Sequence, residues 1–266
     1  MASTIEIGFA GIRYSIDGVN LEEETGPFLD GFRDAAMPGD TYTVKLDRDP
    51  MWKDREPSFQ TTPAWNKEAL KIKLSFCDAE VDFVKRRARI LTGNNIGLFG
   101  LLRFLSATHL IRNGGFLLHA ASVLSSDGSY VFTGVSGSGK TTISALAKEP
   151  LKILTDETTA ICKNSGSFEA HATPFAGDMG NIGVNAGGRV RALFFIEKDT
   201  HFRHRRMERA ETIQRLFQNI ILTVADRSLT DLLFDSVSSF AKAVPCFELG
   251  FRISEDIWRY IDGITR

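Results

Sequence analysis

The chain has 266 residues, of which 43% are hydrophobic and 24% are charged, the balance of a soluble globular protein. Its 32 basic and 33 acidic residues leave a net charge of -1, which provides no general attraction to nucleic acid or to an anionic membrane. No apolar run approaches the roughly 18 residues that span a bilayer, no signal-peptide pattern begins the chain, and three scattered cysteines favour the reducing cytoplasm.

Residues 1–92 are expected to form a β-rich N-terminal domain. Stretches rich in β-branched and aromatic residues at 5–16, 40–46 and 70–76 predict strands, separated by turns that contain Gly, Pro or Asp. Between the first two strands, GPFLDGFRDAAM at 26–37 could form a short helix. None of these segments carries recognisable chemistry.

Residues 93–266 are expected to form a second, larger domain. An apolar period of about 3.6 residues from Asn95 to Asn113 predicts a helix that ends at a glycine pair. The pattern then predicts strands at 116–124, 129–133, 151–163, 168–175, 189–198 and 245–251, and helices at 141–149, 208–224, 228–243 and from Ser254 onward. Residues 176–188 contain five glycines and no periodicity, which predicts a long loop of the kind that often serves as a functional lid.

The most informative segment is GVSGSGKT at 134–141, a complete G-x-x-x-x-G-K-[ST] phosphate-binding loop between a predicted strand and a predicted helix. Glycines let the backbone turn tightly and bring its N–H groups close to phosphate oxygens. The lysine would reach the β- and γ-phosphates, and the hydroxyl that follows it would ligate Mg²⁺. The sequence therefore predicts a nucleoside-triphosphate site made by Gly134, Ser136, Gly137, Ser138, Gly139, Lys140, Thr141 and Thr142.

Two further features lie near this loop in the sequence. Asp156 and Glu157 follow the apolar stretch LKILT, where a carboxylate could hold metal or accept a proton from an attacking hydroxyl; a solvated turn is the alternative. His119 lies in the apolar strand that precedes the loop strand, and without other information a histidine in that position is more often a core residue than a ligand.

The three segments together resemble the core of the phosphoenolpyruvate carboxykinase and HPr kinase/phosphorylase superfamily. The resemblance rests on LLHAASV, YVFTGVSGSGKTTIS and LKILTDETTAI, which give the order histidine strand, phosphate loop, acid pair. It implies an α/β or α+β fold with a P-loop-containing mixed β-sheet core of that type and a smaller β-rich N-terminal domain. It also implies ATP and Mg²⁺ as cofactors, with Asp156 as catalytic base, Glu157 as metal-side acid, and His119 as a phosphate or metal neighbour. Lys140 would be catalytic, and Thr141, Asp156 and Glu157 would hold the metal.

The chain departs from the family pattern at three places. Its second acid is Glu157 where HPr kinases have Asp, Ala120 follows the histidine where they usually have Gly, and their glycine- and arginine-containing signature is not recognisable at 176–188. The last departure leaves the phosphate acceptor open. Carboxykinase activity is not expected, because the chain is about half the size of those enzymes and lacks their substrate-binding motifs.

The leading hypothesis is an ATP-dependent kinase that phosphorylates a serine or another hydroxyl of a protein, peptide or small molecule. The alternative is a non-catalytic nucleotide-binding regulator or assembly factor, and a third, weaker hypothesis is a nucleotide hydrolase coupled to movement. Because HPr kinases form hexamers, the resemblance also allows a homo-oligomer. Neither nucleic acid nor a membrane is expected as a partner.

Two groups of basic residues could contact an anionic ligand. The first, His201, Arg203, His204, Arg205 and Arg206, is interpreted as a solvated turn in preference to a site for an acidic substrate. The second, Arg189 and Arg191, follows the glycine-rich loop and would reach the phosphates if that loop closed as a lid.

Overall fold

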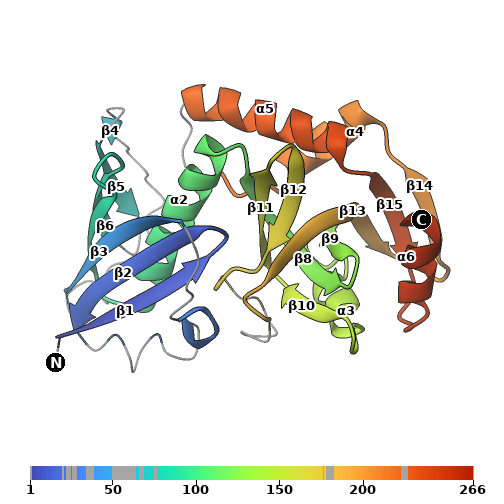
Figure 1. Ribbon diagram of the computed structural model, residues 1–266, viewed down its shortest axis with the longest axis horizontal. Coiled ribbons are helices and arrows are strands. Elements are labelled where there is room, and N and C mark those ends of the chain that lie inside the picture. The colour runs from blue at the N-terminus through green and yellow to red at the C-terminus, as the bar shows by residue number, and fades with distance from the viewer. Residues whose placement is uncertain are drawn as a thin grey trace. The chain divides into compact units, whose positions relative to one another are not determined.

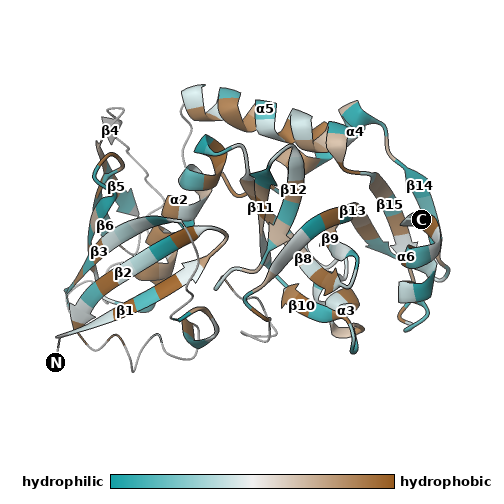
Figure 2. Ribbon diagram, viewed as in Figure 1, coloured by the Kyte–Doolittle hydropathy of each residue, from teal (hydrophilic) through white to brown (hydrophobic). Residues whose placement is uncertain are grey.

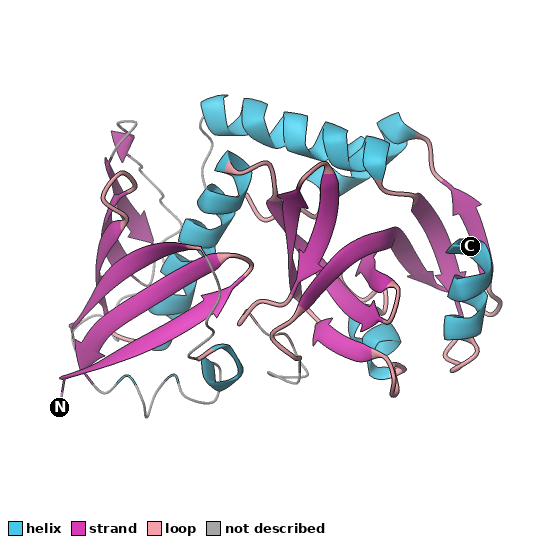
Figure 3. Cartoon of the chain, viewed as in Figure 1, coloured by secondary structure: helices cyan, strands magenta, loops and turns pink. Residues whose placement is uncertain are grey.

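The computed structural model of the chain describes residues 2–19, 21, 25, 29–33, 39–49, 64–65, 69–74, 77–175, 177, 183–222 and 227–265. The chain divides into two compact units, Met1–Ser106 and Ala107–Arg266 (Figure 1). The division falls inside one helix, α2 (Asn95–Arg112), whereas the sequence pattern places a boundary between residues 92 and 93. Each unit combines helical segments with a mixed β-sheet (Figure 3), so the expected α/β class is confirmed.

The first unit is built on a sheet of seven described strands in the order β1-β2-β3-β7-β6-β5-β4. Buried and exposed residues alternate along β2, β3, β6 and β7, as they do where one face of a sheet packs on a core and the other meets solvent. The strands are β1 (Ala2–Phe9), β2 (Ile12–Val19), β3 (Asp40–Arg48), β4 (Ala64–Trp65), β5 (Ala69–Leu74), β6 (Cys77–Asp82) and β7 (Arg87–Thr92).

Three expectations for this unit need correction. The single strand predicted at 5–16 is a hairpin, because Ala10 and Gly11 both adopt positive φ and reverse the chain. The strands β6 and β7 were not predicted, since their alternation is carried by small and charged residues instead of aromatic ones. Of the helix suggested at 26–37, the structure describes a 3-10 turn, η1 (Asp30–Phe32); residues 26–28 and 34–37 lie outside the described residues.

The second unit is built on a sheet of eight described strands. Its path runs β10-β8-β11-β12-β13-β15-β14, and β9 pairs in parallel with β13 and antiparallel with β8. The strands are β8 (Phe116–Ser125), β9 (Gly128–Thr133), β10 (Lys152–Thr155), β11 (Thr158–Asn164), β12 (Ser167–His171), β13 (Gly187–Lys198), β14 (Arg203–Arg206) and β15 (Cys246–Phe251).

Helices cover both faces of this second sheet. On one face, α3 (Lys140–Ala145) and α6 (Ile257–Thr265) pack against Phe132, Phe194 and their neighbours. On the other, α5 (Arg227–Ala243) packs Phe240 edge-on against Phe116, and α4 (Arg209–Phe217) packs against α5. The α5 ribbon alternates between hydrophobic and hydrophilic residues (Figure 2), as expected for a helix with one buried stripe.

The second unit also corrects some boundaries. The strand predicted at 151–163 is two strands, β10 and β11, which separate at Asp156 and Glu157. The helix after the loop is short and ends at Ala145. The basic segment predicted as a turn contains an edge strand, β14, in which Arg203 pairs with Glu197 and Asp199, and Arg205 with Glu211 and Glu248.

Candidate phosphate-binding site

The predicted loop lies between β9 and α3, in the strand–loop–helix context that the sequence predicts. Gly134, Gly137 and Gly139 all have positive φ, at 155°, 78° and 106°. A Cβ added at Gly139 would lie 2.8 Å from the Cζ atom of Phe251, which is too close for a side chain. The loop conformation therefore depends on glycine at that position, both for its backbone angles and for its packing.

Lys140 lies over this loop with 7% of its surface exposed. Its Nζ donates hydrogen bonds to the carbonyl oxygens of Gly134, at 3.0 Å, and Val135, at 3.3 Å. Burial lowers the pKa of the Lys140 ammonium, and the negative charge of Glu157 acts in the opposite direction. The Lys140 ammonium is thus held by two loop carbonyls and partly desolvated.

The hydroxyls of the loop differ in their exposure. Ser136 is exposed, while Thr141 and Thr142 are half-buried. Ser138 is buried, and its Oγ has no hydrogen-bond partner among the described residues. Buried hydroxyls in proteins are normally paired, so this one is available to a ligand that enters the loop.

The His119 ring and the Glu157 carboxylate are in contact at the same end of the sheet, with 3.2 Å between Nε2 and Oε1. Their strands fix this arrangement, since Thr158 pairs with His119 across β11 and β8 and the Ala120 N–H donates to the Glu157 carbonyl. The His119 carbonyl accepts from the Thr133 hydroxyl, directly before the loop. The structure thus brings His119 and Glu157 to the loop end of β9, and Glu157 within electrostatic range of Lys140.

Asp156 and Glu157 point in different directions, although they are adjacent. The Thr155 hydroxyl accepts hydrogen bonds from the N–H groups of Glu157 and Thr158, which makes a tight turn between β10 and β11. Asp156 is 2% exposed, and its Oδ1 accepts a hydrogen bond from the Gly177 N–H at 3.1 Å. The Glu157 side chain keeps 39% of its surface exposed, so it is the more accessible of the two carboxylates.

The donor atoms of the predicted metal ligands are of the type that suits Mg²⁺. Within the part of the chain that the structure describes, no three His, Cys, Asp or Glu side chains are arranged to hold a metal ion by themselves. Thr141, Asp156 and Glu157 supply oxygen donors, the type that Mg²⁺ prefers. Because Mg²⁺ is usually bound by one or two carboxylates together with substrate phosphates, an incomplete protein site is the expected form.

The two arginines predicted to reach the phosphates lie elsewhere. Val190, between them, pairs with Ser129 at the start of β9, whereas the loop follows the end of that strand. Arg191 donates to the Thr265 carbonyl and lies 3.8 Å from Asp127. That part of the prediction was wrong, because β13 already begins at Gly187 and runs alongside β9, with its two arginines at the far end.

Of the predicted loop at 176–188, residues 176 and 178–182 lie outside the described residues. Sequence reasoning also missed two residues beside the phosphate loop, Phe251 and Lys198, which come from the ends of β15 and β13. Their only signal in the sequence is that each ends a strand of the same sheet.

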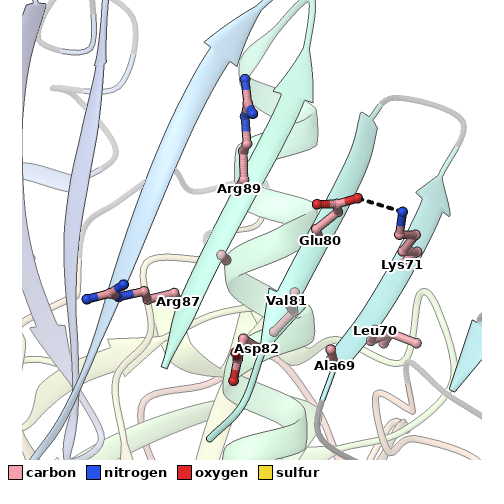
Figure 4. A pocket seen from close by; sticks show the side chains of 9 residues that line it. Ala69, Leu70, Lys71, Glu80, Val81, Asp82, Arg87 and Arg89 are labelled. Atoms are coloured by element: carbon pink, nitrogen blue, oxygen red, sulfur yellow. Dashed lines mark ion pairs between the residues drawn. The ribbon is translucent and has the colours of Figure 1, made fainter. Parts of the chain in front are cut away.

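A different hollow, of about 470 Å³, lies over β5, β6 and β7 of the first unit (Figure 4). Its charged side chains take part in surface ion pairs: Lys71 lies 2.9 Å from Glu80, and Lys85 lies 3.3 Å from Asp82. Its lining residues include neither a glycine nor a Ser, Thr, Cys or His side chain, so it resembles a solvated sheet face more than a catalytic centre.

Comparisons with known proteins identify the family of the chain. No curated protein matches it. The solved structures that match include the HPr(Ser) kinase/phosphatase from Coxiella burnetii, 12% identical, covering 56% of this chain and 88% of that one, with a TM-score of 0.34. A TM-score this low does not establish a shared fold. None of the described helices is long and apolar enough to cross a bilayer. The sequence model of the family described as SynChlorMet cassette protein ScmC matches residues 101–266, which is more than half of the chain, so the chain belongs to the ScmC family.

Proposed function

We propose that this protein is an ATP-dependent, HPr-kinase-like phosphotransferase whose acceptor is a hydroxyl of a protein, peptide or small molecule. The observation that carries the proposal is the placement of Lys140, His119 and Glu157 at one strand end, with the buried Asp156 directly beside them. The three sequence segments that resemble the carboxykinase and HPr kinase core contain all four residues.

The loop would bind the triphosphate. Its N–H groups, the unpaired Ser138 hydroxyl and the Lys140 ammonium provide donors to the phosphate oxygens. Thr141 and Glu157 would hold Mg²⁺ together with those oxygens, since Glu157 is exposed and lies in electrostatic range of Lys140. Mg²⁺ held by these residues would supply neutralisation of the phosphate charge.

Asp156 would act as the base. In transfer, the acceptor oxygen forms a bond to the γ-phosphorus, the bond to the β–γ bridging oxygen breaks, ADP leaves, and the hydroxyl proton passes to the Asp156 carboxylate. The Gly177 N–H now occupies Oδ1 of Asp156, so the acceptor hydroxyl would take the place of this contact. Hydrogen bonds of catalytic groups often form only when substrates are bound.

His119 would orient Glu157 and donate toward the phosphates. Its ring lies 3.2 Å from the Glu157 carboxylate, and the side chain is 35% exposed, which leaves room for a ligand contact. A histidine buried for packing alone would not need to share its Nε2 with an exposed carboxylate.

The experiment measures transfer of radiolabelled γ-phosphate from ATP to the protein itself and to serine-containing peptides, with wild type, Asp156→Asn and Glu157→Gln. Loss of a base lowers kcat by about 10²–10⁴-fold and leaves nucleotide affinity nearly intact, so this is the result expected for Asp156→Asn. Glu157→Gln should raise the Mg²⁺ concentration needed for half-maximal rate.

If Glu157→Gln instead lowers kcat and Asp156→Asn raises the Mg²⁺ requirement, the two acids exchange roles and the proposed kinase activity stands. If wild type binds ATP and transfers phosphate to no acceptor, the non-catalytic regulator becomes the better explanation. That alternative has one structural observation in its favour: Asp156 is covered by Gly177, and Glu157 is paired with His119, so neither acid is free in this conformation.

A further inference from the structure

The strand β13 extends past the end of β9 and lines the phosphate loop. Phe195 pairs with Thr133, the last residue of β9, and β13 continues for three more residues to Lys198. The Ile196 carbonyl oxygen lies 2.9 Å from where a Cβ of Gly134 would be. The Lys198 Cε lies 3.8 Å from the corresponding point at Gly139, which precedes Lys140.

The alternation of the strand explains why the Lys198 side chain reaches the loop. Side chains two residues apart lie on the same face of a strand. Phe194 and Ile196 pack in the core shared with Ile143 of α3, so Lys198, the next residue in this series, lies on the face that α3 and the loop cover. Lys198 itself is exposed.

Two acids flank Lys198 in the sequence, and both are paired with another residue. Glu197 and Asp199 both pair with Arg203 of β14, and Arg203 Nε donates to Asp199 Oδ2 at 2.5 Å. The loop sequence GVSGSGKT contains no acid. A second lysine side chain, whose neighbouring acids are held by Arg203, therefore lies beside the loop that contains Lys140.

We infer that Lys198 is a second phosphate-binding lysine, whose ammonium contacts the polyphosphate of the nucleotide at the Gly139 side of the loop. The inference rests on the proposed nucleotide site. It assigns a substrate contact to a residue 58 positions away from Lys140 in the sequence. Lys198 is a binding residue in this account, and it takes no part in proton transfer.

The test is isothermal titration calorimetry with Mg·ATP and with inorganic tripolyphosphate. The proteins are wild type, Lys198→Ala, Lys198→Arg, Lys140→Ala and the control Lys242→Ala, which removes an exposed lysine in the last turn of α5. A hydrogen bond between charged groups corresponds to about a tenfold or larger loss of affinity, which is expected for both ligands in Lys198→Ala. Lys198→Arg should restore most of the affinity, and Lys242→Ala should bind as wild type does.

The outcomes separate the two proposals. If wild type and Lys140→Ala differ in affinity but Lys198→Ala equals wild type, the inference on Lys198 is wrong and the nucleotide site stands. If Lys198→Ala weakens ATP but not tripolyphosphate, Lys198 contacts the nucleoside and the inference is again wrong. If wild type binds neither ligand, the proposed function fails and this inference fails with it. Equal melting temperatures of wild type and Lys198→Ala would exclude misfolding as the cause of a loss.

Discussion

Individual side chains at the phosphate loop differ in how well their roles follow from the sequence. Lys140 could be identified from the motif, since spacing alone defines it. His119 could not, because an apolar strand with one histidine is compatible with core packing. Its significance depends on a contact with Glu157, 38 residues later, which only the pairing of β8 with β11 creates. The difference in exposure between Asp156 and Glu157 could not be predicted from the sequence either, because it depends on the turn made by Thr155.

His119 provides a prediction at this scale. His119→Ala removes a donor from the phosphate site and the partner of Glu157, so turnover should fall by about 10- to 100-fold, the range for a hydrogen bond to a charged group. Because the side chain is part-exposed, the melting temperature should remain near that of wild type. Steady-state kinetics and thermal unfolding measure the two quantities.

The matched control is His109→Ala, which removes a histidine of α2 that contacts Asn113 and should leave turnover unchanged. A large fall in melting temperature of His119→Ala, with full specific activity in the remaining folded protein, would show that His119 has only a packing role.

At the scale of elements, the strand–loop–helix unit followed from the sequence almost completely. A buried strand, three glycines and helix formers define it, and local chemistry decides each part. Which strands flank this unit in the sheet could not be predicted from the sequence. The parallel pairing of β9 with β13 joins residues about 60 positions apart, and no local pattern records that register. For this reason the sequence predicts Arg191 near the phosphates, although it lies toward the other end of β13.

Gly139 provides a prediction for this element. In Gly139→Ala, the residue would have to keep a φ of 106° and place its Cβ 2.8 Å from Phe251, so we expect a destabilisation of about 1–3 kcal/mol and loss of nucleotide binding. Urea unfolding measures the first effect, and calorimetry with Mg·ATP measures the second.

Gly263→Ala is the control for that substitution. An added Cβ there meets nothing within 4 Å, and replacing a helical glycine by alanine stabilises a helix by about 0.5–1 kcal/mol. If Gly139→Ala were as stable as wild type and bound nucleotide equally well, the loop would not depend on glycine at this position.

The edge strand β14 provides a prediction on pH. The Arg205 guanidinium lowers the pKa of Glu211, and Arg215 and Arg205 together lower the pKa of Glu248. A carboxyl whose pKa is lowered by folding adds stability above its unfolded pKa of about 4.3, and this stability is lost as the pH falls through the folded pKa. The difference in melting temperature between wild type and Arg205→Ala should therefore be largest near neutral pH and vanish in acid.

Arg259→Ala serves as the comparison, because Arg259 lies 3.9 Å from Asp256 in a single exposed pair and should change the melting temperature little at any pH. A difference between wild type and Arg205→Ala that grows as the pH falls would contradict the assigned network. Among the described strands, β14 is the last of its sheet, and its four consecutive basic side chains also discourage edge-to-edge association.

For the whole molecule, the resemblance to the carboxykinase and HPr kinase superfamily implied an α/β or α+β chain, and the structure describes mixed sheets combined with helices. Periodicity indicates many of the individual helices and strands, because it reports which segments bury one face. The order of the strands does not follow in the same way, since it depends on contacts between distant residues such as Phe132 and Phe194. The loop of the second unit supports a proposal for its chemistry, whereas the segments of the first unit carry no motif that suggests a role.

The central claim is that the second unit binds a nucleoside triphosphate at the loop through Lys140. Calorimetric titration of the full chain with Mg·ATP, comparing wild type with Lys140→Ala, tests it most directly. We predict saturable binding to wild type and at least about a tenfold weaker affinity in the variant, the effect of losing a charged hydrogen-bond donor. Equal affinity in the two proteins, with both folded, would contradict the account.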